Sequence, residues 1–576
     1  MNLLGIFHSH SDPSAALLVD DEVVAFGEEE RLTRIKHDHG AFPIRAIRWV
    51  LEYGSLELSD IDYVVQAWDC AKYDDGRMAR RYEEINDCYT TIDEDRAYQR
   101  RLLNQMRSST QKSIIERALR REFGDIRLPP IRFVNHHFAH ACQAFYTSGF
   151  DDALVATIDG SGEDVTTAWW HGRGENLELL HEIRIPHSLG WFYSAFTEYL
   201  GFDAYDGEYK VMGLAAYGKA NPILERKVAE LIWPDAKGGF ETDPSLLSRG
   251  KRSFSYYYPD SLTAHLGRPP RSRVEPVDGY HKNLAFVVQS RLEEVVTAMA
   301  RHWVLQTKAP KLCISGGVGM NVKMNGNLFH SNIFDDVFVY PLCGDLGQSI
   351  GATLALRHEL TGLKSARLGD LYLGPGYSDS RIEELLAGCK VNYRVSKDIT
   401  RDTAALLAQG KVVGWFQGRM EAGPRALGAR SILADPRSEA ARDNVNAAIK
   451  YRELWRPFCP SMTEAGAKRY FHEYTYAPFM IVTFRANDRA RREIPAVVHI
   501  DGTSRPQIID EQSNPRYFSL ISEFDRLTGI PCLLNTSFNI KGEPIVCTPQ
   551  DALRTYFATG LDALAIGSCL LEKTPC

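Results

Sequence analysis

The fold class follows from one stretch of the sequence, Ala153-Leu-Val-Ala-Thr-Ile-Asp-Gly-Ser-Gly-Glu-Asp-Val-Thr-Thr-Ala-Trp-Trp (153–170). Its apolar start predicts a buried strand, its Asp-Gly-Ser-Gly tip predicts a turn, and a second strand follows. The same pattern occurs at 3–19, where a turn at 8–13 separates two apolar runs. A third copy begins at Lys311 and leads into Ser315-Gly-Gly-Val-Gly-Met-Asn, which predicts the start of a helix. Repeated strand–turn units predict a duplicated α/β core with its ligand between the halves.

The tips of these units have the residue types that ligand sites use. Glycine lets backbone N–H groups approach a phosphate closely, and an aspartate at a strand end holds a cation or orients water. Any one of these tips, taken alone, is better explained as an ordinary turn. Three similar tips, one of them glycine-rich, favour nucleotide binding.

Composition excludes several classes of protein. The 576 residues carry 67 Lys+Arg and 74 Asp+Glu, a net charge of −7, and at about 100–200 residues per domain they predict two to four domains. A mildly acidic chain lacks the basic stripe that nucleic acid requires. No apolar run approaches the ~20 residues of a membrane span, and eleven scattered cysteines predict neither a disulfide framework nor a thiolate zinc site. We therefore expect a cytoplasmic protein.

The positions of turn-forming and charged residues predict how the chain divides into domains and inserted segments. Turn-forming residues around 361–380 mark the main domain boundary, and the segment after it has strands and basic residues of its own. The charge-rich stretch 82–123 has helical spacing and is expected to be a solvated insertion. The stretch 221–278 reads as irregular loops that could cover a substrate cleft, with the aromatic run 256–258 lining a pocket or lying exposed.

The first motif with chemical content is Asn135-His-His-Phe-Ala-His. With Asn135 as the helix N-cap, His136 and His140 lie four residues apart on one helical face, which suits two imidazoles on one metal ion. This spacing alone is weak evidence, but Asp159 and Asp345 could complete the ligand set. Two histidines with carboxylates are compatible with Fe, Mn, Zn or Co.

Three neighbouring features are less specific. His137 faces elsewhere on such a helix and is expected to be structural. The Gly316-Gly317 loop lacks the spacing of a P-loop or of the dinucleotide fingerprint, so tight packing competes with nucleotide contact. Glu208 and Lys210 precede a helix of small residues, where a solvated turn is about as plausible as a substrate contact.

The most informative motifs are two basic segments, Gly418–Leu433 and Ile449–Pro460. They concentrate cations in a net-acidic chain: Arg425, Arg430, Lys450, Arg452 and Arg456. Arginine binds phosphate oxygens bidentately, and the Gly-Pro-Arg and Trp-Arg-Pro sequences are more rigid than a solvated face requires. Arg505 and the turn Asn535-Thr-Ser-Phe-Asn add to a predicted second, phosphate-rich site.

Taken together, these motifs resemble the NodU/CmcH family of O-carbamoyltransferases from antibiotic and nodulation-factor biosynthesis. The resemblance runs from Gly5 to about Ser568. Its most specific parts are Gly423-Pro-Arg-Ala-Leu-Gly-Ala-Arg-Ser-Ile-Leu and Trp455-Arg-Pro-Phe, and Glu28-Glu-Glu-Arg-Leu-Thr-Arg-Ile-Lys-His also matches.

The resemblance implies a fold and a reaction. It implies an actin/sugar-kinase-like (ASKHA) domain over 1–366 and a YrdC-like α/β domain over 367–576. The second would form carbamoyl adenylate from carbamoyl phosphate and ATP, with Mg²⁺, and the first would transfer the carbamoyl group to a hydroxyl of a small-molecule acceptor at an Fe²⁺ site. The resemblance also implies the site residues. The family's metal ligands correspond in this chain to His136, His140, Asp159 and Asp345. The family's nucleotide-contact loop corresponds to Gly316, Gly317 and Asn321. The positions that bind ATP and carbamoyl phosphate in its second domain correspond to Arg425, Lys450, Arg456 and Arg505.

The general base is the least determined part of this prediction. Many relatives read His-Asp-x-Ser at the first turn, whereas here Ser11 occupies the histidine position and His10 lies one residue earlier. His10, Asp12 and Glu208, in that order, are the candidates for catalytic residues. The acceptor stays open among antibiotic-like and lipo-oligosaccharide molecules, and so does the oligomeric state, for which a homodimer is considered.

Two other functions compete with carbamoyl transfer. A small-molecule kinase that uses the actin-like core alone would release ADP and would not need carbamoyl phosphate. A non-catalytic nucleotide- and metal-binding switch would bind partners without turnover. Neither function requires a second phosphate site, so the basic segments favour the transferase.

Overall fold

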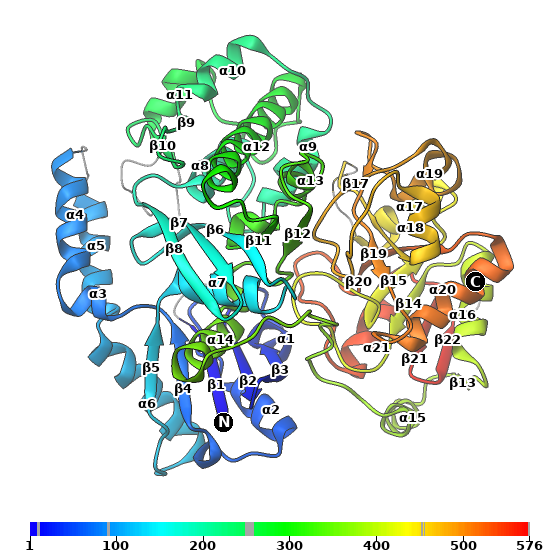
Figure 1. Ribbon diagram of the computed structural model, residues 1–576. Helices are drawn as coiled ribbons and strands as arrows, with labels where there is room; N and C mark the ends of the chain where they lie inside the picture. The colour runs from blue at the N-terminus through cyan, green and yellow to red at the C-terminus, as the bar shows by residue number, and fades with distance from the viewer. Residues whose placement is uncertain (9–11, 89–92, 248–257, 451–452, 454, 574–576) are drawn as a thin grey trace. The chain divides into compact units, whose positions relative to one another are not determined.

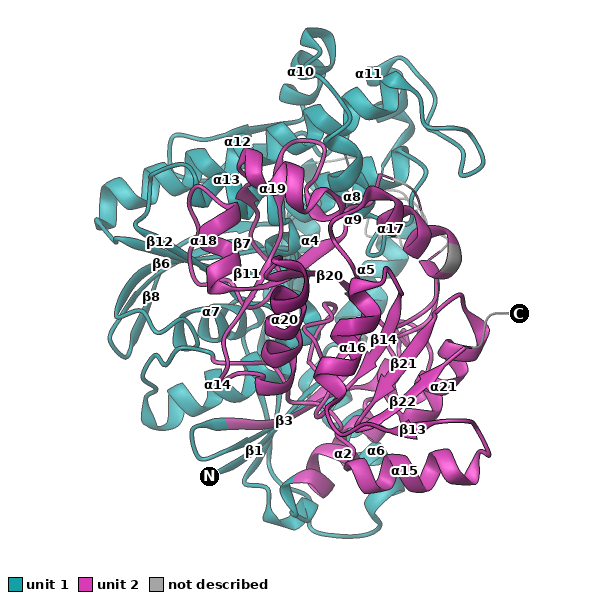
Figure 2. Ribbon diagram, turned by 90° about the vertical axis from the view of Figure 1, so that its right-hand side faces the viewer, with its two compact units in different colours: residues 1–7, 16–22, 54–368 teal, residues 8–15, 23–53, 369–576 magenta. Residues whose placement is uncertain are grey.

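The computed structural model describes residues 1–8, 12–88, 93–247, 258–450, 453 and 455–573 (Figure 1). Contacts divide the chain into two compact units (Figure 2). Unit 1 comprises residues 1–7, 16–22 and 54–368, and unit 2 comprises 8–15, 23–53 and 369–576. The chain thus changes unit near the boundary expected around 361–380, and N-terminal segments belong to the second unit. How the functional domains divide stays a prediction.

Two five-stranded sheets share one strand order. The first runs β3-β2-β1-β4-β5 and the second β12-β11-β6-β7-β8, so each places its first strand at the centre, between the other two strands of a meander on one side and two later strands on the other. In both sheets the first, fourth and fifth strands are parallel. The strands of the first sheet are β1 (Asn2–Phe7), β2 (Ser14–Val19), β3 (Glu22–Glu28), β4 (Tyr63–Ala67) and β5 (Ile131–Val134). Those of the second are β6 (Asp152–Gly162), β7 (Val165–Arg173), β8 (Asn176–Arg184), β11 (Lys311–Ser315) and β12 (Asp336–Val339).

This repeat agrees with the duplicated α/β core expected from the sequence. Helix α14 (Gln348–Thr361) packs on β1 and β4, whereas α7 (His136–Tyr146) packs on β6 and β11. The two helices touch closely, because a Cβ at Gly351 would lie 2.8 Å from the carbonyl oxygen of Ala139. The pair therefore forms the layer between the sheets of unit 1.

The stretch 82–123 is helical, but the expectation of a solvated insertion is wrong in part. It belongs to a group of helices between β4 and β5: α3 (Ala71–Asp74), α4 (Arg77–Cys88), α5 (Asp93–Gln105) and α6 (Ser108–Phe123). Most of their charged residues are exposed, although Lys72 and Asp95 are buried. One face buries an apolar cluster that includes Met78, Tyr82, Ile85 and Leu102, together with Trp191 from a helix far along the chain.

The stretch 221–278 is also more regular than predicted, because it contains secondary structure. It forms α10 (Pro222–Ala229), β9 (Ile232–Pro234), β10 (Phe240–Thr242) and α11 (Asp260–Leu266). It is preceded by α8 (Leu189–Tyr199) and α9 (Glu208–Ala215) and followed by the long helix α12 (Gly279–Thr307). Residues 256 and 257 of the aromatic run lie outside the described part of the chain, while the Tyr258 ring packs edge-on against Tyr199.

Unit 2 is built on one mixed sheet of eight strands in the order β13-β22-β21-β14-β15-β20-β16-β19. The strands are β13 (Arg394–Val395), β14 (Val413–Phe416), β15 (Arg430–Ala434), β16 (Cys459–Thr463), β19 (Gln507–Ile509), β20 (Cys532–Ser537), β21 (Ala563–Ile566) and β22 (Cys569–Glu572). The main helices of this unit are α15 (Asp379–Gly388), α16 (Ile399–Ala408), α17 (Glu439–Val445), α18 (Glu464–Tyr470), α20 (Pro515–Thr528) and α21 (Pro549–Ala558). Both units are thus α/β, as the sequence predicts. Among the described residues, none of the helices has the length and apolar character needed to cross a bilayer.

Candidate metal centre and candidate phosphate site

Unit 1 brings two histidines and two aspartates together at one point. His140 Nε2 lies 3.0 Å from Asp159 Oδ2 and 3.7 Å from Asp345 Oδ1. His136 Nε2 lies 3.4 Å from each of the same two oxygens. One ligand atom from each residue falls within 4.8 Å of all the others. Two imidazole nitrogens and two carboxylate oxygens that converge in this way form a donor set that fits a divalent transition metal.

Local structure explains why these four side chains meet. The Asn135 side chain accepts the N–H of Phe138 and begins α7, so the predicted N-cap and the shared face of His136 and His140 are confirmed. Asp159 lies on β6, and Asp345 begins a short 3-10 helix just before α14. The Nδ1 of His140 lies 3.1 Å from the Ser315 hydroxyl, which fixes the ring with Nε2 toward the centre.

The imidazoles and carboxylates of this cluster shift one another's pKa. Burial opposes protonation of His136, but the carboxylates of Asp345 and Asp159 outweigh it and raise its pKa to about 10. Burial likewise opposes ionisation of Asp345, and the nearby imidazoles lower its pKa to about 2 in spite of Asp159. Such mutual dependence is typical of groups that share one ligand, although ion pairs in protein cores show it too.

His137 is structural, as predicted. Its Nδ1 lies 2.8 Å from the Thr157 hydroxyl and its Nε2 lies 3.0 Å from the carbonyl oxygen of Val165. Burial, together with the positive charge of the neighbouring histidines, lowers its pKa to about 3 and keeps it neutral.

The glycine-rich loop lies beside the candidate metal centre. Gly316 has φ 90°, and a Cβ there would lie 2.3 Å from the carbonyl oxygen of Ile158. A Cβ at Gly317 would lie 3.0 Å from Asp159 Oδ1. Asn321 has other partners, since it caps α13 (Val322–Phe329) and pairs its amide with that of Gln289 at 2.9 Å. The loop geometry therefore suits a ligand near Asp159 better than one at Asn321.

The structure describes the surroundings of two of the three candidates for the general base. His10 lies outside the described residues. Asp12, in unit 2, has φ 58° and its Oδ1 lies 2.7 Å from Nδ1 of His37. Glu208, in unit 1, is the first residue of α9 and accepts from the Ser194 hydroxyl at 2.8 Å and from the Tyr205 N–H at 3.1 Å. Burial raises the pKa of Glu208 above its ordinary value.

In unit 2, predicted cationic residues gather at one end of the sheet. The ammonium group of Lys450 donates to the Ser537 carbonyl at 2.6 Å and to Asn539 Oδ1 at 2.8 Å, so it holds the turn after β20. At the same end, where β16 begins antiparallel to β20, Arg505 donates to Cys459 Sγ at 2.8 Å.

The other two predicted cationic residues, Arg425 and Arg456, lie in segments that reach the same end of the unit 2 sheet. The Asn535 amide of β20 donates to the carbonyl of Ala426, the residue after Arg425. Arg456 precedes β16 by three residues. We call the four residues Arg425, Lys450, Arg456 and Arg505 the basic edge. Arg452 lies outside the described part of the chain.

Comparison with known proteins decides the family. The model of the carbamoyltransferase N-terminus matches residues 2–354, and that of the carbamoyltransferase C-terminus matches residues 404–573. The chain belongs to the carbamoyltransferase family. This carbamoyltransferase is 37% identical to the nodulation protein NolNO of Sinorhizobium fredii over 98% of its own length and 79% of that protein. It is 36% identical to the uncharacterized protein sll1178 of Synechocystis over 100% and 97% of the two chains.

Similarity to solved structures is weaker. Component A of the (R)-2-hydroxyglutaryl-CoA dehydratase of Acidaminococcus fermentans is 12% identical, covers 62% of the carbamoyltransferase and 98% of its own chain, and has a TM-score of 0.33. HypF of T. kodakarensis is 13% identical with a TM-score of 0.32, and the match covers 62% and 48% of the chains. Values this low carry no assignment of fold or function.

One cation of the basic segments has a structural role that sequence reasoning missed. Arg430 of the carbamoyltransferase is fully buried, lies 3.7 Å over the Phe416 ring and donates to backbone carbonyls, including those of Gln417 and Pro375. It is therefore no part of the phosphate site expected for the cluster. Buried Glu421 fixes the same loop, because its Oε1 accepts the N–H groups of Leu427, Ala429 and Arg430.

The structure also shows a hydrogen-bonding role for the sequence motif that begins at Glu28. Glu28 Oε1 accepts the N–H of Gly423 at 2.7 Å, and Arg31 donates to the carbonyl of the same glycine at 2.9 Å. Arg34 donates to the carbonyl of Ile545 at 2.7 Å. All of these contacts lie within unit 2, and those of Glu28 and Arg31 support the loop that carries Arg425, a long-range function that no local sequence pattern reveals.

Proposed function

We propose that this carbamoyltransferase transfers the carbamoyl group of carbamoyl phosphate to a hydroxyl of a small-molecule acceptor and consumes ATP in doing so. The basic edge would form carbamoyl adenylate, and the metal centre would be the place of transfer. The net reaction converts carbamoyl phosphate, ATP, water and an alcohol into the carbamate ester, AMP, pyrophosphate and phosphate. The ASKHA-type nature of the first domain and the YrdC-like nature of the second belong to this proposal.

The observation that carries the proposal is the presence of two chemically different sites in separate units. The donor set of unit 1 suits a metal, whereas the basic edge of unit 2 suits the phosphates of ATP and carbamoyl phosphate. Formation of an adenylate depends on positioning and on neutralising charge, which the cations of this edge and Mg²⁺ would provide. A kinase that uses one core has no need for the second site.

The metal centre fits the transfer step. His136, His140, Asp159 and Asp345 would hold a divalent metal, with Fe²⁺ as the expected ion, and a metal bound there supplies a Lewis acid that polarises the carbamoyl carbonyl. The N–H of Gly317, beside Asp159, would orient a phosphate oxygen of the adenylate. A carboxylate such as Glu208, whose pKa is raised by burial, would accept the proton of the attacking hydroxyl.

The test of the proposal is the identity of the nucleotide product. We expect purified protein with Mg²⁺, ATP and carbamoyl phosphate to release pyrophosphate as carbamoyl adenylate forms, and to release AMP when a hydroxyl acceptor, or water in its absence, attacks that adenylate. We expect no release of either product without carbamoyl phosphate. Lys450→Ala should reduce this activity at least tenfold, whereas Lys468→Ala, an exposed lysine paired with Glu464, is the matched control. Release of ADP, or release that is indifferent to carbamoyl phosphate, would favour the kinase instead.

A further inference from the structure

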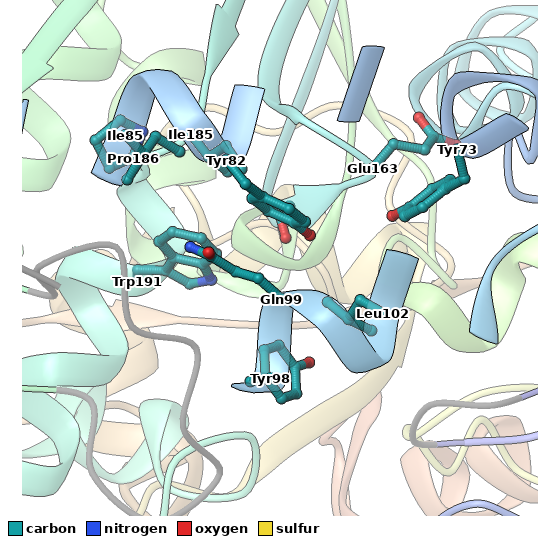
Figure 3. A pocket seen from close by; sticks show the side chains of 11 residues that line it. Tyr73, Tyr82, Ile85, Tyr98, Gln99, Leu102, Glu163, Ile185, Pro186 and Trp191 are labelled. Atoms are coloured by element: carbon teal, nitrogen blue, oxygen red, sulfur yellow. The ribbon is translucent and has the colours of Figure 1, made fainter. Parts of the chain in front are cut away.

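One buried carboxylate of unit 1 contacts both the start of α7 and the helices inserted between β4 and β5. That insertion runs through residues 68–130, whereas the equivalent connection between β11 and β12 needs only 316–335. Glu163 lies at the turn between β6 and β7, four residues after the candidate ligand Asp159, and its side chain is fully buried. Figure 3 shows Glu163 and Tyr73 of α3 on the wall of the same small cavity.

Each carboxylate oxygen of Glu163 contacts both of these segments. Oε1 accepts the N–H of Asp69 at 2.6 Å and the N–H of His136 at 3.2 Å. Oε2 accepts the side-chain amide of Asn135 at 3.2 Å and lies 3.5 Å from the ammonium group of Lys72. Asp69 and Lys72 lie at the start of the insertion, whereas Asn135 and His136 lie at the start of α7. One side chain therefore connects the insertion to a candidate metal ligand.

The candidate ligand His136 depends on such contacts more than His140 does. The ring of His140 is held through Nδ1 by the Ser315 hydroxyl, whereas none of the described residues hydrogen-bonds to Nδ1 of His136. Histidine ligands usually have a partner on this second nitrogen, which fixes the orientation of the ring. The His136 ring instead contacts Gly162, where a Cβ would lie 2.2 Å from its Cδ2, and packs edge-on against the Trp68 ring at 5.5 Å. Packing and the backbone hydrogen bond therefore position this imidazole.

We propose that Glu163 is a positioning residue of the metal centre, through which the inserted helices α3–α6 hold His136 in place. The metal affinity of the centre then depends on the contacts that Glu163 makes with Asp69 and Lys72, although neither residue is a ligand. This inference rests on the proposed function, because it takes His136 as a ligand of the metal that serves the transfer step.

Glu163→Gln tests this connection with little loss of packing. Lys72 keeps a partner, because its ammonium group lies 2.8 Å from Asp164 Oδ1, and the glutamine oxygen can still accept the N–H groups that Oε1 accepts. The NH₂ group of the glutamine then faces Lys72 and the Asn135 amide, which are donors as well. Asn135 cannot turn to accept it without giving up the cap of α7, since its Oδ1 accepts the N–H of Phe138. A buried donor without an acceptor is costly, so the start of α7 has to rearrange.

The test is a titration of the metal-free, full-length protein with Co²⁺, followed by calorimetry and by visible absorption. Co²⁺ is the probe because its d–d bands change with the geometry of its ligands. Loss of a group that orients a metal ligand lowers affinity about 10–100-fold, so we expect Glu163→Gln to bind Co²⁺ about tenfold more weakly and with shifted bands. Lys72→Gln, on the side of the insertion, should weaken binding about threefold or more.

Two matched variants control for the removal of a charge. Glu178→Gln is exposed on β8, and Arg77→Gln is exposed on α4, where it pairs with Asp75 at the surface of the same insertion. Both should bind Co²⁺ with the affinity and the bands of the wild type. Thermal unfolding of each metal-free variant reports stability separately from metal binding. If Glu163→Gln does not fold, Lys72→Gln decides by the same two readouts.

A purely structural role for Glu163 predicts a different result. In that case Glu163→Gln would lower the melting temperature and leave the Co²⁺ affinity and the d–d bands unchanged, which would overturn the inference. An equal effect of Glu178→Gln would overturn it as well. Release of AMP by the wild type is measured in parallel. Failure of Glu163→Gln to alter Co²⁺ binding overturns this inference alone, missing AMP overturns the proposed function, and a wild type that binds no Co²⁺ overturns the metal centre together with this inference.

Discussion

At the residue scale, the loop that precedes β15 depends on a glycine that no other residue can replace without strain. Gly428 has φ 96°, and a Cβ at this position would lie 2.1 Å from the Tyr517 ring. The Gly428 carbonyl also accepts the indole N–H of Trp415 at 2.9 Å. This single position thus joins the strand core of unit 2 to the loop that carries Arg425.

We expect Gly428→Ala to lower the free energy of unfolding by more than about 2 kcal/mol, since it combines a forbidden backbone conformation with a steric overlap. Thermal or urea unfolding measures the change. Gly388→Ala is the matched control, because a Cβ at Gly388, the last residue of α15, meets nothing within 4 Å. Equal stability of the two variants would contradict this assignment.

The four candidate metal ligands lead to a second prediction at this scale. Asp159→Asn removes a charge that lies within 3.4 Å of both imidazoles, so the apo protein should lose at least tenfold in affinity for a divalent transition metal. Metal titration followed by the rise in melting temperature reports this affinity. Asp152→Asn, at the start of β6 and away from the centre, should bind metal like the wild type. A variant at Asp159 with unchanged affinity would remove this residue from the ligand set.

At the element scale, helix α7 positions the centre through its N-terminus. Asn135 caps the helix and also donates to Glu163 at 3.2 Å, and Glu163 accepts the N–H of His136. Asn135→Ala should therefore cost about 1 kcal/mol of stability and weaken metal binding as well.

A second capped helix provides the control for this prediction. Asn221 caps α10 by accepting the N–H groups of Ile223 and Leu224, far along the chain from the ligands. Asn221→Ala should lose similar stability and keep the metal affinity of the wild type. Calorimetric titration with metal separates the two effects, and equal affinities in both variants would show that the cap of α7 does not position His136.

The elements also show what the sequence could and could not predict. The strand–turn repeats, the cap at Asn135 and the shared face of His136 and His140 are local patterns, so periodicity and capping rules found them. Two expectations failed for a different reason. The charges of 82–123 concealed a buried face, and Arg430 looked like a phosphate ligand although it binds backbone carbonyls.

The positions that sequence reasoning missed depend on contacts between distant parts of the chain. Glu163 follows the candidate metal ligand Asp159 closely in sequence, but its contact with His136 appears only when β6 packs on α7. Glu28 and Gly423 lie 395 residues apart and meet only in the folded unit 2. Spacing rules describe neighbours along a helix or strand and carry no information about such pairs.

At the scale of the whole molecule, the central claim is a division of labour between the metal centre of unit 1 and the basic edge of unit 2. A chelator that spares Mg²⁺, such as 1,10-phenanthroline, should therefore stop carbamoyl transfer and the AMP release that accompanies it, and leave pyrophosphate exchange into ATP in the presence of carbamoyl phosphate within about twofold of its initial rate. The non-chelating 1,7-isomer is the control. Loss of both activities with the chelator would show that the metal also serves adenylate formation.

The most direct measurement of this claim is pyrophosphate exchange into ATP in the presence of carbamoyl phosphate, compared between two variants. His140→Ala, which removes a metal ligand, should keep the exchange and lose carbamoyl transfer to the acceptor. Lys450→Ala should lose the exchange. If His140→Ala abolishes the exchange, or if Lys450→Ala retains it at the rate of the wild type, the two steps do not belong to the two sites assigned to them.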